Sequence, residues 1–89
     1  MEIRVYGPGC PRCNELEKRV RNVLAQLGVA ADLQKVTDPR AIADAGVLFT
    51  PGLTIDGKLV STGKVPTERE VTTLITTALA AAEGPGGGD

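Results

Sequence analysis

The sequence predicts a single α/β domain in which a four-stranded mixed sheet is flanked by three helices, in the order βαβαββα. Three observations support this prediction. The first half contains a strand, a helix and a strand joined by tight turns, an Asp-Gly pair then separates two alternating segments, and a capping box opens a last amphipathic helix. A chain of 89 residues has room for one core. We expect residues 1–83 to form this domain and the Gly-rich residues 84–89 to be a disordered tail.

The first strand and helix are predicted from periodicity. Residues 2–6 alternate, with Ile3 and Val5 on one face, as in a half-buried strand. Residues 7–9, Gly-Pro-Gly, end the strand, and Gly28 is a natural residue to follow the last turn of the next helix. That helix, from about residue 13 to residue 27, has apolar residues at helical spacing, namely Leu16, Val20, Val23, Leu24 and Leu27.

The second strand and helix complete a βαβ unit. Residues 29–36 favour a strand in which Val29, Ala31 and Leu33 share a face. The pair Asp38-Pro39 then supplies an N-cap and a helix-opening proline for about two turns of helix that end at Gly46. Two strands joined in this way are parallel and connected by a right-handed crossover.

The second half predicts a hairpin followed by a helix. Two alternating segments, residues 53–55 and 58–60, flank an Asp-Gly turn, which indicates an antiparallel pair. Residues 61–66 are predicted to be a loop. Thr67 and Glu70 then match a capping box, which opens a helix with an apolar stripe formed by Val71, Leu74, Ile75, Ala78, Leu79 and Ala82.

Composition excludes several classes of function. The chain has 10 basic and 11 acidic residues and only two aromatic ones, which argues against nucleic-acid binding. The N-terminus lacks the pattern of a signal peptide, and no apolar stretch approaches the roughly 20 residues of a membrane helix. We therefore expect a cytoplasmic protein without membrane attachment. In a reducing compartment, two cysteines are more often a redox or metal pair than a structural disulfide.

The two cysteines lie in the segment Cys10-Pro11-Arg12-Cys13, at the predicted head of the first helix. This spacing places the sulfurs one helical turn apart, within reach of a disulfide. Unpaired N–H groups at a helix N-terminus favour a thiolate, so we expect Cys10 to have a lowered pKa, and the charge of Arg12 should lower it further. Pro11 suits the first helical position, because its missing N–H would have had no partner there.

Dithiol/disulfide chemistry is therefore the leading interpretation of the Cys10/Cys13 pair. The alternative is a soft-metal carrier or thiol sensor that binds Cu(I) or Zn²⁺ through the same two thiols. The chain has no histidine and no third cysteine, so a closed zinc site would require a dimer. A binding module that keeps the fold without turnover is a third possibility, and the presence of both cysteines argues against it.

The order of elements, the segment Gly9-Cys10-Pro11-Arg12-Cys13, the segment Thr50-Pro51-Gly52-Leu53 and residues 56–66 together resemble one known family. This family comprises the small thioredoxin- and glutaredoxin-like proteins of bacteria and archaea, which are also called redox-active disulfide proteins. The resemblance covers roughly residues 2–82. It implies a thioredoxin-like fold, no bound cofactor, and a monomeric thiol-disulfide oxidoreductase. Its expected partners are protein or small-molecule disulfides and an electron donor of the thioredoxin-reductase type.

The resemblance also assigns roles to individual residues. Cys10 would be the attacking thiolate and Cys13 the resolving thiol. Thr50-Pro51 would be a cis peptide beside the cysteines, which leaves the Thr50 backbone free to align an incoming peptide. Pro11 and Arg12 would complete the substrate-binding surface.

The chain departs from the family pattern at several positions. Gly9 stands where typical thioredoxins have tryptophan, and the first strand offers no evident buried carboxylate for the proton of the resolving thiol. Arg12 replaces the tyrosine of the glutaredoxin C-P-Y-C motif. Residues 61–64, Ser-Thr-Gly-Lys, match poorly the Gly-Gly and acidic residues with which glutaredoxins hold glutathione, which argues against glutathione use.

Overall fold

A computed structural model describes residues 1–83 and contains the predicted elements in the predicted order. The prediction of a disordered tail concerns residues 84–89, which lie outside the described residues. The strands are β1 (Glu2–Tyr6), β2 (Asp32–Val36), β3 (Gly52–Ile55) and β4 (Lys58–Thr62), and the helices are α1 (Pro11–Leu27), α2 (Pro39–Asp44) and α3 (Glu68–Glu83).

The four strands form one mixed sheet in the order β2-β1-β3-β4. β1 pairs in parallel with β2, as the predicted crossover requires, and Tyr6 at its end lies opposite Val36. β1 also pairs antiparallel with β3, where Tyr6 lies opposite Gly52. The end of β1 and the start of β3 therefore meet at the same edge of the sheet. This places the turn after β1 beside the Thr50-Pro51 segment.

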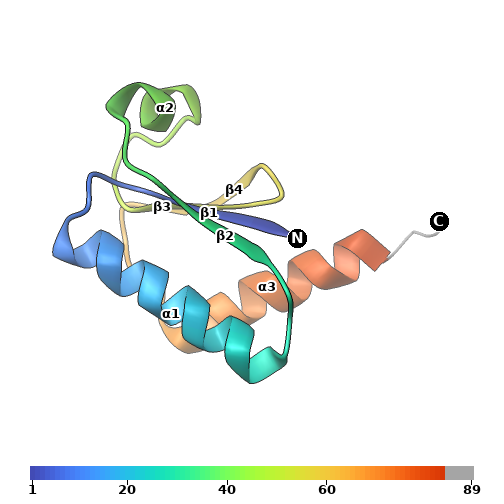
Figure 1. The fold of residues 1–89 in the computed structure, drawn as a ribbon. Helices are drawn as coiled ribbons and strands as arrows, with labels where there is room; N and C mark the ends of the chain where they lie inside the picture. Colours follow the sequence, from blue (N-terminus) through green and yellow to red (C-terminus); the bar gives the residue numbers. More distant parts are fainter. Residues whose placement is uncertain (84–89) are drawn as a thin grey trace.

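The helices cover the two faces of the sheet unequally. α1 and α3 lie together on one face and the short α2 lies on the other (Figure 1). The main core is formed between the sheet and the pair α1 and α3, by Ile3, Val5, Leu16, Val20, Val23, Leu24, Leu53, Ile55, Val71 and Ile75. A smaller cluster under α2 consists of Tyr6, Ile42 and Val47. Among residues 1–83, no helix is both long enough and apolar enough to cross a membrane.

Two strand boundaries differ from the prediction for identifiable reasons. β2 begins at Asp32 and not at Val29, because the N–H of Val29 still donates to Leu24 O in the C-terminal cap of α1. β4 continues to Thr62 where a loop was predicted from residue 61, because Ser61 pairs with Leu53 after a local shift in register. α1 also starts slightly earlier than its apolar periodicity indicated, at Pro11.

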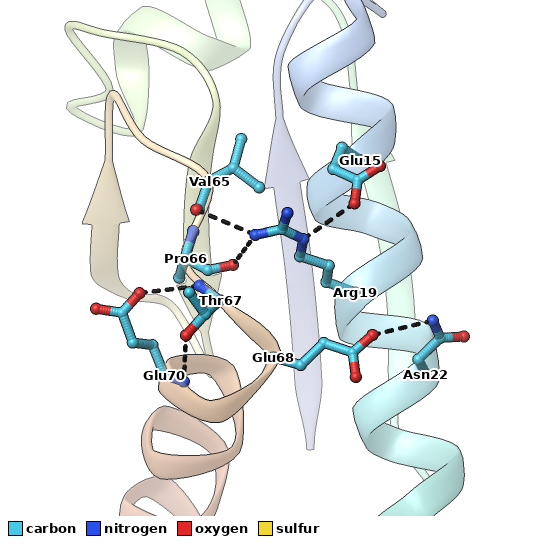
Figure 2. A network of polar contacts seen from close by, with 8 residues as sticks. All are labelled: Glu15, Arg19, Asn22, Val65, Pro66, Thr67, Glu68 and Glu70. Atoms are coloured by element: carbon cyan, nitrogen blue, oxygen red, sulfur yellow. Dashed lines mark hydrogen bonds and ion pairs between the residues drawn. The ribbon is translucent and has the colours of Figure 1, made fainter.

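The start of α3 is fixed by the predicted capping box and by a contact from α1. The Thr67 N–H donates to the Glu70 carboxylate over 2.9 Å, and the Glu70 N–H donates to Thr67 Oγ1 over 3.1 Å. Figure 2 shows Arg19 of α1 reaching the segment before this helix, where Nη1 donates to the carbonyls of Pro66 at 2.9 Å and Val65 at 3.4 Å. The segment between β4 and α3 is therefore tied to the helix that carries the cysteines.

Candidate dithiol active site

The cysteines lie at the junction between the end of β1 and the start of α1. Cys10 is the N-cap residue of α1, with extended backbone angles, and Pro11 occupies the first turn as predicted. The sulfur of Cys10 accepts a hydrogen bond from the N–H of Cys13 over 3.4 Å. The sequence therefore folds locally so that one sulfur faces the unpaired N–H groups of the first helical turn.

The two thiols are free, and they differ in exposure. The sulfurs of Cys10 and Cys13 are hydrogen-bonded to each other at 2.6 Å. Cys10 is partly exposed, whereas Cys13 is 1% exposed. An incoming disulfide can therefore reach the sulfur of Cys10 and cannot reach that of Cys13 directly.

The surroundings shift the pKa values of the two thiols in opposite directions. The pKa of Cys10 is lowered, first by the hydrogen bond from the Cys13 thiol and then by backbone N–H groups at the start of the helix. The pKa of Cys13 is raised, first by burial and then by its hydrogen bond to Cys10. This arrangement favours a thiolate at Cys10 and a neutral thiol at Cys13.

The side chain of Arg12 contacts a segment far away in the sequence. Its Nη2 donates over 2.8 Å to the carbonyl oxygen of Gly63, in the segment after β4. The backbone N–H of Arg12 is among the groups that lower the pKa of Cys10. The guanidinium therefore makes a structural contact with a distant segment, and the predicted effect of its charge on Cys10 stays a prediction.

Thr50-Pro51 is a cis peptide bond, and Thr50 lies close to the cysteines. Gly7 lies between them: a Cβ built on Gly7 would overlap Cys13 Sγ and would stand 3.8 Å from Thr50 Cβ. Pro51 is fully buried. The structure therefore brings Cys10, Cys13, Thr50 and Pro51 together, although about 40 residues separate the two pairs in the sequence.

The carbonyls on either side of Thr50 are already hydrogen-bonded. The Thr62 hydroxyl donates to Phe49 O over 2.9 Å, and the Gly63 N–H donates to Pro51 O over 2.9 Å. The N–H and C=O of Thr50 itself have no hydrogen-bond partner in the part of the chain that the structure describes. Thr50 is therefore the residue of this segment that can pair with an added strand.

Sequence reasoning did not identify several residues around the cysteines. Gly7 is one, because its role depends on the distant contact with Cys13. Leu48 and Phe49 are others: they precede Thr50 directly and are 84% and 70% exposed. One signal in the sequence pointed to Leu48 and Phe49: they are adjacent apolar residues that belong to no helical or strand-like apolar pattern. Together they form a contiguous exposed apolar surface, and such surfaces can mark sites of interaction.

The described residues hold no further group that points to a metal centre. Within residues 1–83, no cluster of three or more His, Cys, Asp or Glu side chains is placed to hold a metal ion. The soft-metal alternative would therefore depend on the Cys10 and Cys13 thiols alone, and no observation favours it.

The chain is similar to a known protein family and to individual known proteins. A family model described as "Thioredoxin domain" matches residues 1–76. The chain is similar to a thioredoxin of Methanothermobacter thermautotrophicus, with 38% identity over 71 residues that cover 80% of this chain and 92% of the relative. It is also similar to a thioredoxin of Methanocaldococcus jannaschii, with 41% identity over 69 residues that cover 78% of this chain and 79% of the relative.

Proposed function

Because the chain belongs to the thioredoxin domain family and is a thiol-disulfide oxidoreductase, we propose that Cys10 is its attacking thiolate and Cys13 its resolving thiol. The observation that carries this proposal is the asymmetry of the pair. Cys10 is partly exposed and has a lowered pKa, whereas Cys13 is buried and has a raised pKa. The thiolate is the nucleophile in disulfide exchange, so attack begins at Cys10.

The exchange proceeds in two displacements. The Cys10 thiolate attacks one sulfur of the substrate disulfide, the second substrate sulfur leaves as a thiolate, and a mixed disulfide to Cys10 forms. The released substrate thiolate takes up the proton of Cys13, whose sulfur lies 2.6 Å from Cys10 Sγ before the reaction. The Cys13 sulfur then attacks Cys10 Sγ and breaks its bond to the substrate sulfur, which leaves as a thiolate and takes a proton from water. The substrate leaves as a dithiol that has gained two electrons, and Cys10 and Cys13 become a disulfide that has lost them.

We further propose that an extended segment of a protein substrate pairs with Thr50. Within residues 1–83, the backbone N–H and C=O of Thr50 have no hydrogen-bond partner, whereas the carbonyls of Phe49 and Pro51 accept hydrogen bonds from Thr62 and Gly63. A strand added here would place its disulfide next to Cys10. Main-chain pairing gives affinity with little dependence on the substrate's side chains.

The exposed Leu48 and Phe49 support a protein as the substrate. They extend the surface beside Thr50 and offer apolar area that a polypeptide can cover and a small disulfide cannot. Pro11 and Arg12, at the head of α1, border the same surface on the side of the cysteines.

The remaining parts of the proposal concern partners and location. A reductase of the thioredoxin-reductase type regenerates the Cys10/Cys13 dithiol, and the protein acts in the cytoplasm as a monomer. Light scattering of the purified chain at micromolar concentration tests the monomer, and a mass near twice 9.2 kDa would contradict it.

Trapping of intermediates tests the assignment of the two cysteines. Cys13→Ser should accumulate a mixed disulfide between Cys10 and a substrate such as oxidised insulin, detected by non-reducing electrophoresis and mass spectrometry. Cys10→Ser should trap nothing. Trapping through Cys13 in the Cys10→Ser variant would reverse the roles, and a wild-type protein that reduces no disulfide would refute the function.

A second experiment tests the apolar surface. The double variant Leu48→Ser/Phe49→Ser should lower the ratio of kcat/KM for a peptide disulfide to that for hydroxyethyl disulfide by about tenfold, or about 1.4 kcal/mol. That loss is slightly smaller than the gain from fully burying one large apolar side chain, about 1.5 to 3 kcal/mol, as expected if a substrate covers these side chains only in part. Leu27→Ser is the matched control, because Leu27 is the remaining exposed large apolar residue of the described chain and lies at the far end of α1. An equal ratio in all three proteins would exclude the surface from substrate binding.

A further inference from the structure

The Thr62–Gly63 turn, formed by the last residue of β4 and the glycine that follows it, touches both halves of the site. Its hydroxyl and N–H hold the carbonyls of Phe49 and Pro51, so it determines where Thr50 lies. The carbonyl oxygen of Gly63 in turn accepts the hydrogen bond from Arg12. A continuous series of hydrogen bonds therefore runs from the helix that carries the cysteines to the segment that is proposed to bind substrate.

This turn is closely packed as well as hydrogen-bonded. Gly63 has a φ of +77°, a conformation that side chains other than glycine adopt at a cost. A Cβ built on Gly63 would stand 3.0 Å from Phe49 Cβ, which is tighter than ordinary contact. The turn therefore has one well-defined position against the Phe49–Pro51 segment.

The far end of the same connecting segment is also held by an arginine of α1. Arg19, two helical turns beyond Arg12, donates to the carbonyl of Pro66 (Figure 2). Arg19 thus fixes the segment at the start of α3, and Arg12 fixes it at the turn beside the cysteines. The two contacts set the distance between α1 and the connection from β4 to α3.

We propose that Arg12 is a positioning residue that acts through Gly63. Its hydrogen bond holds the Thr62–Gly63 turn, and with it Thr50, at a fixed distance from Cys10, so that a peptide can pair with Thr50 while its disulfide lies on the Cys10 sulfur. This inference rests on the proposed pairing of substrate with Thr50. It assigns to Arg12 a mechanical role, distinct from the role of a positive charge beside the thiolate.

A positioning role and a charge effect of Arg12 predict different rates for peptide disulfides and for small disulfides. A peptide disulfide must engage Thr50 and Cys10 at once, so its binding depends on the distance between them. A small disulfide such as hydroxyethyl disulfide needs only the Cys10 sulfur. A charge effect would instead change the Cys10 thiolate and affect both substrates alike.

Substitutions at Arg12 and Gly63 test this role. Arg12→Met should lower the ratio of kcat/KM for a peptide disulfide to that for hydroxyethyl disulfide by about tenfold, mainly through a higher KM for the peptide. Arg12→Lys should recover part of the ratio, because an ammonium group can still donate to the Gly63 carbonyl. The pH midpoint of Cys10 alkylation should stay at its wild-type value in both variants.

Disturbing the other end of the contact should produce the same effect. Gly63→Ala should displace the turn from Phe49. The double variant Arg12→Met/Gly63→Ala should lower the peptide-to-hydroxyethyl-disulfide ratio of kcat/KM no more than the stronger single substitution does. Thr62→Val, which removes the bond to Phe49 O, serves if the Gly63 variant does not fold. Arg21→Met is the matched control, because Arg21 on the same helix pairs with Glu17 and, within residues 1–83, forms no other side-chain hydrogen bond or ion pair.

Each outcome decides the proposal. A shifted Cys10 midpoint with equal losses for both substrates would assign Arg12 an electrostatic role and overturn the positioning role. An unchanged ratio in Arg12→Met would reduce the contact to a surface hydrogen bond without function. If the wild-type protein reduces hydroxyethyl disulfide but no variant differs on peptides, the inference alone fails, whereas inactivity toward both substrates refutes the proposed function.

Discussion

Replacing Gly7 by alanine tests how closely the resolving sulfur is packed. Gly7 follows β1 directly, and an alanine Cβ at this position would overlap Cys13 Sγ and stand 3.1 Å from Cys13 Cβ. The backbone of Gly7 is not in the left-handed region, so the substitution adds only the steric conflict. Cys13 is 1% exposed and has little free space into which to retreat.

The expected magnitude follows from this overlap. Inserting one methyl group into a closely packed site costs about 1 to 3 kcal/mol. In a domain of this size, each kcal/mol changes Tm by about 4 to 8 °C, so Gly7→Ala should lower Tm by about 4 to 24 °C. The displaced Cys13 sulfur should also resolve the mixed disulfide more slowly, so this intermediate should persist longer than in the wild type.

A double-mutant cycle isolates the responsible atom. In a Cys13→Ala background the sulfur is absent, and the nearest atom to the new Cβ is the Cβ at position 13, at 3.1 Å. Gly7→Ala should then cost less than about 1 kcal/mol in urea unfolding at equilibrium, below the range expected for overpacking. The same loss in both backgrounds would refute the assignment of the conflict to the sulfur.

Three further predictions follow from single contacts. Cys13→Ala should raise the pKa of Cys10, because the thiol donor is lost, whereas Cys13→Ser retains a donor; equal alkylation midpoints in the two variants would contradict this cause. The pKa of Glu70 is lowered, first by its hydrogen bond from the Thr67 N–H, so its contribution to stability is complete above the ordinary value near 4.5 and lost as the pH falls through the lowered native value. Glu70→Gln should therefore make the free energy of unfolding depend less on pH in this acidic range. Urea titrations at pH 7 and pH 3 measure the difference in this free energy, and the same difference in the variant and the wild type would contradict the prediction. Arg19→Met should lower the free energy of unfolding by about 1.5 kcal/mol and Tm by about 6 to 12 °C, since the chain loses a charged hydrogen bond; a Tm change below about 2 °C would show that the bond contributes little.

The sequence by itself determined the features that depend on neighbouring residues. Cys10-Pro11 opens α1, Thr67 caps α3 together with Glu70, and the turn at residues 56–57 joins β3 to β4, all as predicted. Capping and tight turns satisfy backbone groups within three or four positions, so their signals are local. The cis bond at Thr50-Pro51 was predicted from the family resemblance, because only about 5 to 6% of X–Pro bonds are cis.

Only the tertiary structure decided how these local pieces form the site. Arg12 bonds a carbonyl 51 residues away, and the place of Gly7 against Cys13 depends on how α1 packs against the end of β1. The Phe49 carbonyl is likewise held by the Thr62 hydroxyl, at the end of a strand β4 that continues past its predicted end. These contacts join segments whose relative positions are fixed by the packing of the whole core, and no local preference in the sequence encodes that packing.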